Sequence, residues 1–324
     1  MNIEKVSQLA GVSKSTVSRY LNNGSVSQRT KEKIEKIIKT HNYEPNRFAQ
    51  SLKAKRTNML GVIVPRVDSF AANETFKGID KVLHDSGLQS IIYYTNQDIN
   101  REMEGLKALF NQRVDGIILM ATHMTAEHMS IINSVDIPVV IVGQFSEGVH
   151  CIIHDDYGAG RKMAEYIARY FKDDLLYLGV SDTDEAVGIK RRDGVLDYFD
   201  TLGITCKTAE TSFNYSEAFD DIGVIFEASV PEVMICATDN IALAALKHAI
   251  ERGISVPDEL SITGFGGYNT TNIVTPTLTT VRFGYFEAGE KAAESILKLI
   301  DGERISMIQH VGNELIINES VDKK

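Results

Sequence analysis

The chain has 324 residues, of which 43% are hydrophobic and 24% are charged, a composition typical of a soluble globular protein with two or three domains. No apolar run approaches the roughly 20 residues of a membrane span, and no apolar N-terminal segment suggests secretion, so we expect a cytoplasmic protein without a membrane partner. The three cysteines are widely separated, which is typical of buried thiols in a reducing compartment.

The formal net charge of −10 is distributed unevenly along the chain. Residues 1–56 contain 12 Lys and Arg and 4 Asp and Glu, a net charge of +8, which leaves −18 for the rest. A basic head on an acidic body predicts that only the head contacts a polyanion. A solvated basic tail is the alternative, but the helical spacing of its apolar residues argues against disorder.

Three short helices are predicted in the head. The first has apolar residues at helical spacing from Ile3 and ends at Gly11, and Ser13 is placed to cap a second helix that begins at Lys14. A third helix is expected after Ser27. Two short helices joined by a Gly-containing turn, of which the second carries short polar and basic side chains, are typical of a helix-turn-helix.

The exposed face predicted for the second helix suits a DNA major groove. That groove is about 12 Å wide, so a helix that enters it needs short or flexible side chains that form hydrogen bonds. Arg19 can make a bidentate contact with guanine, and Lys14 and Ser15 can reach a phosphate or a base edge. The alternative is a packing module without a role in DNA binding, which the charge of the head disfavours.

The stretch "YEPNRFAQSLKAKRTN" follows the head and predicts a hinge. Pro45 stops the preceding helix, and Asn46 can cap a short helix in which Ala49 and Leu52 share a face with Phe48. About two helical turns are marginal in water, so this helix should need support from DNA and a second copy of the chain. A solvated linker is the alternative.

From Met59 onward, short apolar runs such as "MLGVIV", "GIILMA" and "PVVIVG" alternate with helical patterns at 72–86, 101–111 and 126–133. A second series begins at "LLYLGV". Strands that alternate with helices predict parallel sheets covered by helices on both faces. Two such units in one chain place a ligand between them, at the carboxyl ends of the strands.

Polar residues at these strand ends are the candidates for ligand binding. Asp239 follows "VMICAT" and precedes a helix predicted from Asn240, so its carboxylate can accept hydrogen bonds from sugar hydroxyls or simply cap the helix. Arg191 precedes "RDGVLDYFDTLG" and can bind vicinal hydroxyls or a carboxylate, or lie on the surface beside Arg192.

The stretches "VSQLAGVSKSTVSRYLNN", "TDNIALAALKHAI", "VPDELSITGFGGY" and "PTLTTVRF" together resemble the LacI/GalR family of bacterial transcription regulators. The resemblance implies an all-α helix-turn-helix head at 1–44, a hinge helix and linker at 45–57, and a two-lobed α/β core at 58–324. This periplasmic-binding-protein-like core would contain two doubly wound parallel sheets. Its first lobe would comprise about 58–155 and 285–310 and its second about 156–284 and 311–320, with crossovers near Asp155, Phe283 and Val311.

The resemblance also implies roles for individual residues. Those implied to contact DNA are Lys14, Ser15, Thr16, Ser18, Arg19, Asn22, Thr30, Asn46, Ala49 and Leu52, the last as a wedge between base pairs. The candidate effector-binding residues are Asp68, Ser69, Phe70, Asn73, Gln144, Arg191, Asp239, Phe265 and Tyr268. For each of the aromatic residues, packing in the core is the alternative.

Taken with these patterns, the resemblance implies a homodimeric repressor whose two heads read a palindromic DNA operator, and a small sugar that releases the repressor from that operator. The stretch "VPRVDSFAANETFKGIDKVL" looks like the branch of the family that includes sucrose-operon repressors, which favours sucrose or a related sugar. We expect no enzymatic activity, no cofactor and no metal site, because the sequence has no phosphate loop, nucleophile elbow or metal-binding frame.

Two other functions stay open at the level of sequence. One is a regulator controlled by a protein co-effector of the sugar-transport system, which the mixed charges around Lys77, Lys81 and Arg101 support only slightly. The other is a sugar-processing α/β enzyme with a DNA-binding head, which would need a base and a nucleophile that converge in the cleft.

Overall fold

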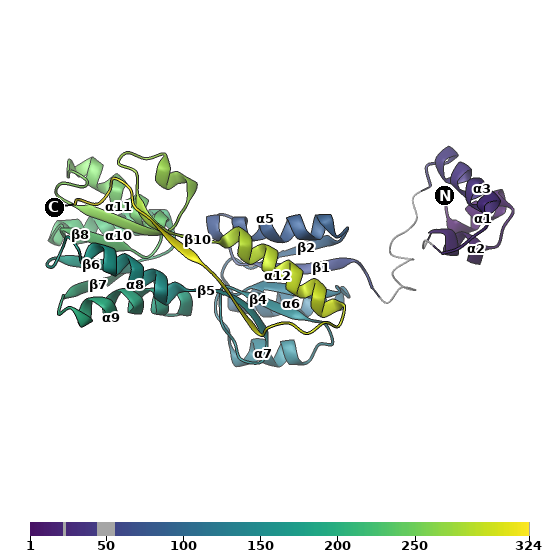
Figure 1. The fold of residues 1–324 in the computed structure, drawn as a ribbon, viewed down its shortest axis with the longest axis horizontal. Coiled ribbons are helices and arrows are strands. Elements are labelled where there is room, and N and C mark those ends of the chain that lie inside the picture. Colours follow the sequence, from purple (N-terminus) through teal and green to yellow (C-terminus); the bar gives the residue numbers. More distant parts are fainter. Residues whose placement is uncertain (22–23, 44–55, 324) are drawn as a thin grey trace.

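The computed structural model describes residues 1–21, 24–43 and 56–323. Figure 1 shows a small helical head and two α/β lobes that follow one another along the long axis. The head consists of α1 (Ile3–Ala10), α2 (Lys14–Leu21) and α3 (Gln28–Thr40), which confirms the three predicted helices. Asn2 and Ser27 cap α1 and α3 through their side chains, and Val6, Val17 and Ile34 form the fully buried centre.

Each lobe is built on a six-stranded sheet. The first has the order β11-β5-β4-β3-β1-β2 and comprises β1 Met59–Val64, β2 Gln89–Tyr94, β3 Gly116–Met120, β4 Val139–Val142, β5 His150–His154 and β11 Ile308–Val311. The second has the order β12-β10-β9-β8-β6-β7 and comprises β6 Leu175–Gly179, β7 Cys206–Glu210, β8 Val233–Cys236, β9 Ser261–Gly266, β10 Thr279–Phe283 and β12 Asn313–Ile316. Central strands such as β3 and β6 are buried along their whole length, which explains their continuous apolar sequences.

Helices cover both faces of the sheets. In the first lobe, α5 (Phe70–Asp85) and α12 (Tyr285–Ile300) pack on one face, and α6 (Ile99–Asn111) and α7 (Ala126–Asn133) pack on the other. In the second lobe, α8 (Asp156–Ile167) packs against α9 (Arg192–Thr201), and α10 (Tyr215–Ala228) packs against α11 (Asp239–Arg252). Among the described helices, none is both long and apolar enough to pass through a bilayer.

Two helices begin two residues earlier than the sequence pattern predicted. We expected starts at Ala72 and Arg101, whereas α5 begins at Phe70 and α6 at Ile99. The reason is the capping residue, because Ser69 and Asp98 accept hydrogen bonds from the first-turn backbone N–H groups and so fix the starts. Apolar periodicity alone does not reveal these caps.

The chain passes between the lobes three times: after β5, after β10, and between β11 and β12. The predicted fold class is confirmed, with one refinement to the expectation of parallel sheets, since β12 pairs antiparallel with β10. The direction follows from the crossovers. Strand β10 runs out of the second lobe at its end, whereas β12 enters that lobe at its start, so adjacent strands must run in opposite directions.

Glycines allow two pairs of helices to approach closely. A Cβ atom on Gly78 of α5 would collide with the carbonyl oxygen of Phe286 in α12, and one on Gly289 would collide with that of Thr75. In the second lobe, Gly160 of α8 and Gly194 of α9 face each other's helix backbones in the same way. Each lobe therefore has one backbone-to-backbone helix contact that a larger residue cannot enter.

We predict that Gly289→Ala destabilises the protein by about 1–3 kcal/mol, because the added methyl forces α12 away from α5. Urea denaturation of the isolated protein measures this change. Gly312→Ala is the matched control and should be close to neutral, since a Cβ atom there meets nothing within 4 Å. Equal stabilities of the two variants would contradict the close helix contact.

Candidate functional site

The exposed face of α2 carries the residues predicted to read bases. Lys14, Ser15 and Arg19 are exposed, and Thr16 and Ser18 are half-buried. The Oγ atom of Ser13 lies 2.8 Å from Ser15 Oγ and 2.8 Å from Thr16 Oγ1, which fixes the N-terminal turn of α2. Asn22, Asn46, Ala49 and Leu52 lie outside the described residues, so the hinge prediction has no structural counterpart here.

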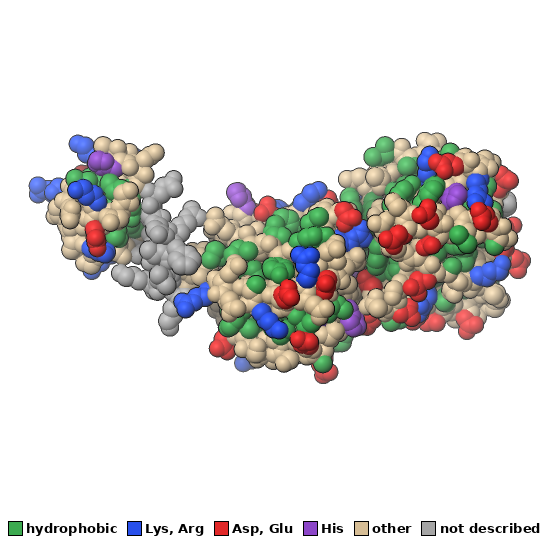
Figure 2. All heavy atoms as spheres, turned by 180° about the vertical axis from the view of Figure 1, so that it is seen from behind, with side chains coloured by type: hydrophobic (Ala, Val, Ile, Leu, Met, Phe, Trp, Pro, Cys, Tyr) green, Lys and Arg blue, Asp and Glu red, His purple; other side chains and the backbone are tan. Residues whose placement is uncertain are grey.

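The distribution of charged side chains distinguishes the head from the core. Figure 2 shows Lys and Arg side chains over the head and many Asp and Glu side chains over the second lobe. Lys14 Nζ lies 2.7 Å from Glu4 Oε1, but both side chains are more than half exposed, so a phosphate can compete for Lys14. Thr30 contacts the capping Ser27 at 2.8 Å and so supports the start of α3.

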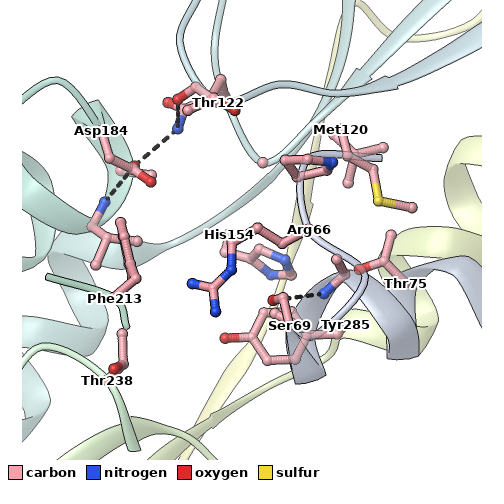
Figure 3. A pocket seen from close by; sticks show the side chains of 18 of the residues that line it. Arg66, Ser69, Thr75, Met120, Thr122, His154, Asp184, Phe213, Thr238 and Tyr285 are labelled. Atoms are coloured by element: carbon pink, nitrogen blue, oxygen red, sulfur yellow. Dashed lines mark hydrogen bonds between the residues drawn. The ribbon is translucent and has the colours of Figure 1, made fainter. Parts of the chain in front are cut away.

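A cavity of about 180 Å³ lies between the two lobes, at the carboxyl ends of the strands. A cavity of this volume has room for on the order of a dozen water molecules. Figure 3 shows Arg66, His154 and Tyr285 directed into the space between the lobes. The first lobe and the crossovers contribute Pro65, Arg66, Ser69, Ala71, Ala72, Thr75, Gln97, Met120, Ala121, Thr122, Val142, Gly143, Gln144, His154 and Tyr285, and the second contributes Asp156, Asp184, Ala186, Val187, Arg191, Phe213, Thr238, Asn240 and Tyr268.

Arg191 lines this cavity, but its guanidinium is already bound by the protein. Its Nε and Nη2 atoms donate to Asp156 Oδ1 at 3.1 and 2.6 Å, and Nη1 donates to the carbonyl of Ala237. The rings of Phe265 and Phe283 lie 5.1 and 4.8 Å from its centre. Burial raises the pKa of the Asp156 carboxyl, while Arg191 opposes that rise, so the ion pair compensates two buried charges.

Phe265, a predicted effector-binding residue, is fully buried, packs its ring 5.1 Å from the Arg191 guanidinium and is not part of the cavity wall.

Asp239 does not reach the cavity surface. It is fully buried, its Oδ1 accepts the hydroxyl hydrogen of Thr280 at 2.6 Å, and its Oδ2 accepts the N–H of Tyr268 at 2.8 Å. The cap of α11 is Thr238, so the alternative that Asp239 caps the helix is wrong, as is the predicted start at Asn240. Asp239 instead fixes the "GFGGY" loop, in which Gly267 has φ +69°.

The predicted ligand residues after β1 divide into two groups. Ser69 lines the cavity and caps α5. Asp68 points to Arg66, whose Nε and Nη2 donate to its two oxygens at 3.0 Å, and Asn73 donates to the carbonyl of Val67 at 3.1 Å. These two side chains shape the loop and are not part of the cavity wall.

Phe70 connects the lobes. Its ring lies 4.6 Å from that of Tyr268, which itself lines the cavity from the second lobe. Phe70 is not itself part of the cavity wall, so its contribution in this structure is an aromatic contact between the lobes.

A polar connection crosses the cavity at Gln144. Its Nε2 donates to the carbonyl of Thr122 at 3.1 Å in the same lobe and to Asp184 Oδ1 at 3.0 Å in the other. Burial raises the pKa of Asp184, whereas the N–H of Val187 and the Gln144 amide lower it. Because Asp184 starts the π-helix η1 (Glu185–Arg191), this bond links the first lobe to the segment that carries Arg191.

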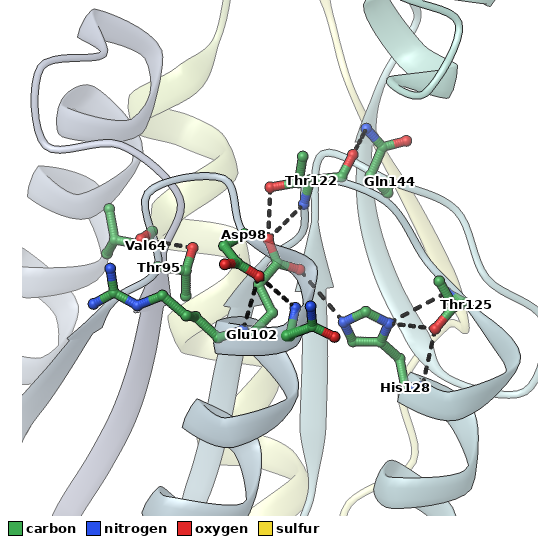
Figure 4. A network of polar contacts seen from close by, with 10 residues as sticks. Val64, Thr95, Asp98, Glu102, Thr122, Thr125, His128 and Gln144 are labelled. Carbon is green, nitrogen blue, oxygen red and sulfur yellow. Dashed lines mark hydrogen bonds and ion pairs between the residues drawn. The ribbon is translucent and has the colours of Figure 1, made fainter.

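Thr122 is held in turn by a buried carboxylate. Figure 4 shows Glu102 and His128, both fully buried, behind the cavity wall. Glu102 Oε1 accepts the Thr122 hydroxyl at 2.6 Å and its N–H at 3.2 Å, and Glu102 Oε2 lies 3.5 Å from His128 Nε2. The orientation of Thr122, and hence of its carbonyl toward Gln144, is therefore fixed from inside the lobe.

Comparison with known proteins identifies the family of this chain. The profile of the bacterial regulatory proteins of the lacI family matches residues 2–46, and that of the periplasmic binding protein-like domain matches 172–321. The sucrose operon repressor of Staphylococcus xylosus is 41% identical over 305 residues, which cover 94% of this chain and 95% of that protein. The chain belongs to the lacI family.

One further relative and one solved structure are also similar to this lacI-family chain. The HTH-type transcriptional regulator TreR of Escherichia coli K12 is 27% identical over 306 residues, 93% of this chain and 94% of that protein. The structure of the lac repressor dimer bound to operator and the anti-inducer ONPF has a TM-score of 0.90 at 22% identity and covers 99% and 98% of the two chains. As a member of this family, the protein is a DNA-binding transcriptional regulator.

Sequence reasoning missed several residues of the cavity. Arg66 and His154 line it, and His154 Nδ1 is buried without a hydrogen-bond partner among the described residues. Burial lowers the pKa of His154 to about 4, and Arg191 acts in the same direction, so the ring is neutral at pH 7. The acidic stretch "SDTDE" was the available signal for Asp184, but nothing in it indicates a contact with Gln144.

Burial raises the pKa of Asp239 to about 6, although the hydrogen bonds from Thr280 and Tyr268 oppose that rise. In an unfolded chain the pKa is about 3.9, so the folded state takes up the proton first as the pH falls. We predict that wild-type protein gains about 1 kcal/mol of stability between pH 7 and pH 5 relative to Asp239→Asn.

Urea denaturation of both proteins across this pH range measures the difference. A difference that does not change with pH would show that Asp239 does not titrate in this window.

Proposed function

We propose that this protein represses genes for the use of sucrose or a closely related sugar, and that the sugar binds between the lobes and releases the operator. The cavity at the strand ends of both sheets carries this proposal, because groups from both lobes would contact one ligand. The 41% identity to a sucrose operon repressor supports the choice of sugar.

The chemistry of the cavity wall suits a hydroxyl-rich ligand. Hydroxyl, amide and imidazole groups of Thr75, Gln97, Thr122, His154 and Thr238 line it beside apolar side chains. The charges of Arg191 and Asp156 compensate each other, as do those of Arg66 and Asp68. Neutral hydrogen-bonding groups on an apolar surface suit the binding of a sugar.

DNA binding and ligand binding are linked through the mutual position of the lobes. We propose a homodimer in the cytoplasm whose two heads read a palindromic operator through Lys14, Ser15 and Arg19, with hinge contacts at Asn46, Ala49 and Leu52. A sugar that favours a lobe arrangement without the Gln144–Asp184 bond would lower operator affinity, and by linkage the operator would lower sugar affinity.

Sucrose is expected to raise the melting temperature and to lower the affinity for a duplex that the wild-type protein selects from a random library. Thermal denaturation measures the first effect, and fluorescence anisotropy of the labelled duplex measures the second. Ala71→Phe is the control, because Ala71 lines the cavity from the first turn of α5 and a larger side chain there fills it.

That variant should bind the selected duplex but not respond to sucrose. A wild-type protein that shows no response to sucrose, or an Ala71→Phe variant that responds like the wild type, would contradict the proposed effector site.

Arg19→Ala should reduce binding to the selected duplex by about 1–3 kcal/mol, because a bidentate contact with a base is lost. Its side chain is exposed on α2, so folding should not change. Competition against random duplex measures the discrimination, and Arg29→Ala, an exposed residue of α3, serves as the comparison of equal charge. Equal discrimination by the two variants would remove Arg19 from base reading.

A further inference from the structure

The described part of the linker is attached to the first lobe at two points. Asp115, in the loop before β3, accepts the N–H of Thr57 at 2.7 Å and the N–H of Asn58 at 2.7 Å with its two oxygens. The Thr57 hydroxyl adds a bond of 3.0 Å to the same carboxylate. Two successive backbone N–H groups on one carboxylate fix the path of the chain before β1 begins.

The second attachment lies at the end of α12. Arg56 donates to Asp301 Oδ1 at 2.8 Å and to the carbonyl of Ile300 at 2.8 Å. Asp301 is the C-cap residue of α12, where an arginine also interacts favourably with the helix dipole. Because both side chains are about half exposed, this ion pair is the weaker of the two attachments.

Both attachment points belong to elements that reach the cavity at their other ends. Strand β3 begins directly after Asp115 and ends at Met120, which lines the cavity roughly 17 Å away. Helix α12 begins at Tyr285, which also lines the cavity, and its 16 residues span about 24 Å to its end at Ile300. Figure 1 shows that α12 and β1 extend to the side of the lobe that faces the head.

We propose that Asp115, assisted by Asp301, anchors residues 56–58 to the first lobe and thereby sets the affinity for the operator. When both heads bind one site, the chain between core and head loses conformational entropy. Residues that are already anchored have less entropy to lose, so the anchor reduces this cost. Asp115 and Asp301 are positioning residues in this scheme, since neither belongs to the head. The link to the cavity through β3 and α12 rests on the proposed function.

The deciding experiment compares binding of a selected duplex and of a random duplex by the full-length protein without ligand. Asp115→Asn should lower affinity for the selected duplex about tenfold. The variant releases about one residue from its anchor, and the entropy lost when that residue is ordered on binding corresponds to about this change in affinity. Affinity for the random duplex should stay unchanged, since the head is intact. Asp136→Asn, an exposed carboxylate of the same lobe, is the matched control and should bind like the wild type.

Melting temperatures show whether a variant is folded. If Asp115→Asn melts at a much lower temperature, Thr57→Val combined with Asp301→Ala replaces it. This pair of changes weakens both attachments, because it removes the Thr57 hydroxyl bond and the Arg56–Asp301 ion pair, and it leaves Asp115 in place. A charge exchange, Arg56→Asp with Asp301→Arg, should recover the affinity that Asp301→Ala loses. Wild-type affinity for the selected duplex in Asp115→Asn, or in the double variant, would overturn the anchor.

A sucrose titration then separates this inference from the proposed function. The wild type should release the selected duplex on addition of sucrose, and Asp115→Asn should show a smaller change in affinity. A smaller change supports the route through β3 and α12, and an equal change overturns it. A wild type that does not respond removes the proposed effector, while the ligand-free titration still decides whether the anchor exists.

Discussion

The buried ion pair of Arg191 and Asp156 is the interaction on which the second-lobe side of the cavity depends. Both side chains are at least 95% buried, so the removal of either partner would leave an uncompensated charge, at a cost of about 3–5 kcal/mol. The pair joins the end of η1 to the start of α8, directly after the first crossover. It therefore fixes the part of the second lobe that lines the space between the lobes.

The two lobes communicate through few polar contacts. Inside the first lobe, Glu102 accepts a hydrogen bond from Thr122. The Gln144 amide donates to the Thr122 carbonyl and also to Asp184 in the second lobe. The Phe70–Tyr268 ring contact is a second connection between the lobes, and Tyr268 also lines the cavity. A ligand that enters must displace or accommodate these contacts, which gives it a direct influence on the angle between the lobes.

The same elements that end at the cavity begin or end near the linker. Strand β3 and helix α12 each have one end at the ligand cavity and the other at the attachment of residues 56–58. The glycine contacts between α5 and α12 keep this part of the lobe closely packed, so it moves as a unit. In the proposed scheme, this part of the first lobe contributes both to operator affinity and to ligand binding.

Three features can be predicted from the amino-acid sequence alone: the helix-turn-helix head, the charge difference between head and body, and the alternation of strands and helices in the core. The charge difference follows from local composition. The helices and strands follow from the spacing of apolar residues, which repeats about every 3.6 residues in a helix and every two in a strand. The sequence also placed Ser69, Gln144, Arg191 and Tyr268 at strand ends, where the structure brings them together around the cavity.

Other features follow from the packing of distant segments. The Asp239 carboxylate accepts hydrogen bonds from Thr280 and Tyr268, Phe265 packs against Arg191, and Arg66 and His154 line the cavity. A strand end fixes the edge of the sheet to which a side chain belongs, but its hydrogen-bond partners come from segments far away in the chain. Whether a carboxylate faces a ligand or a neighbouring loop depends on those partners, and local pattern carries no information about them.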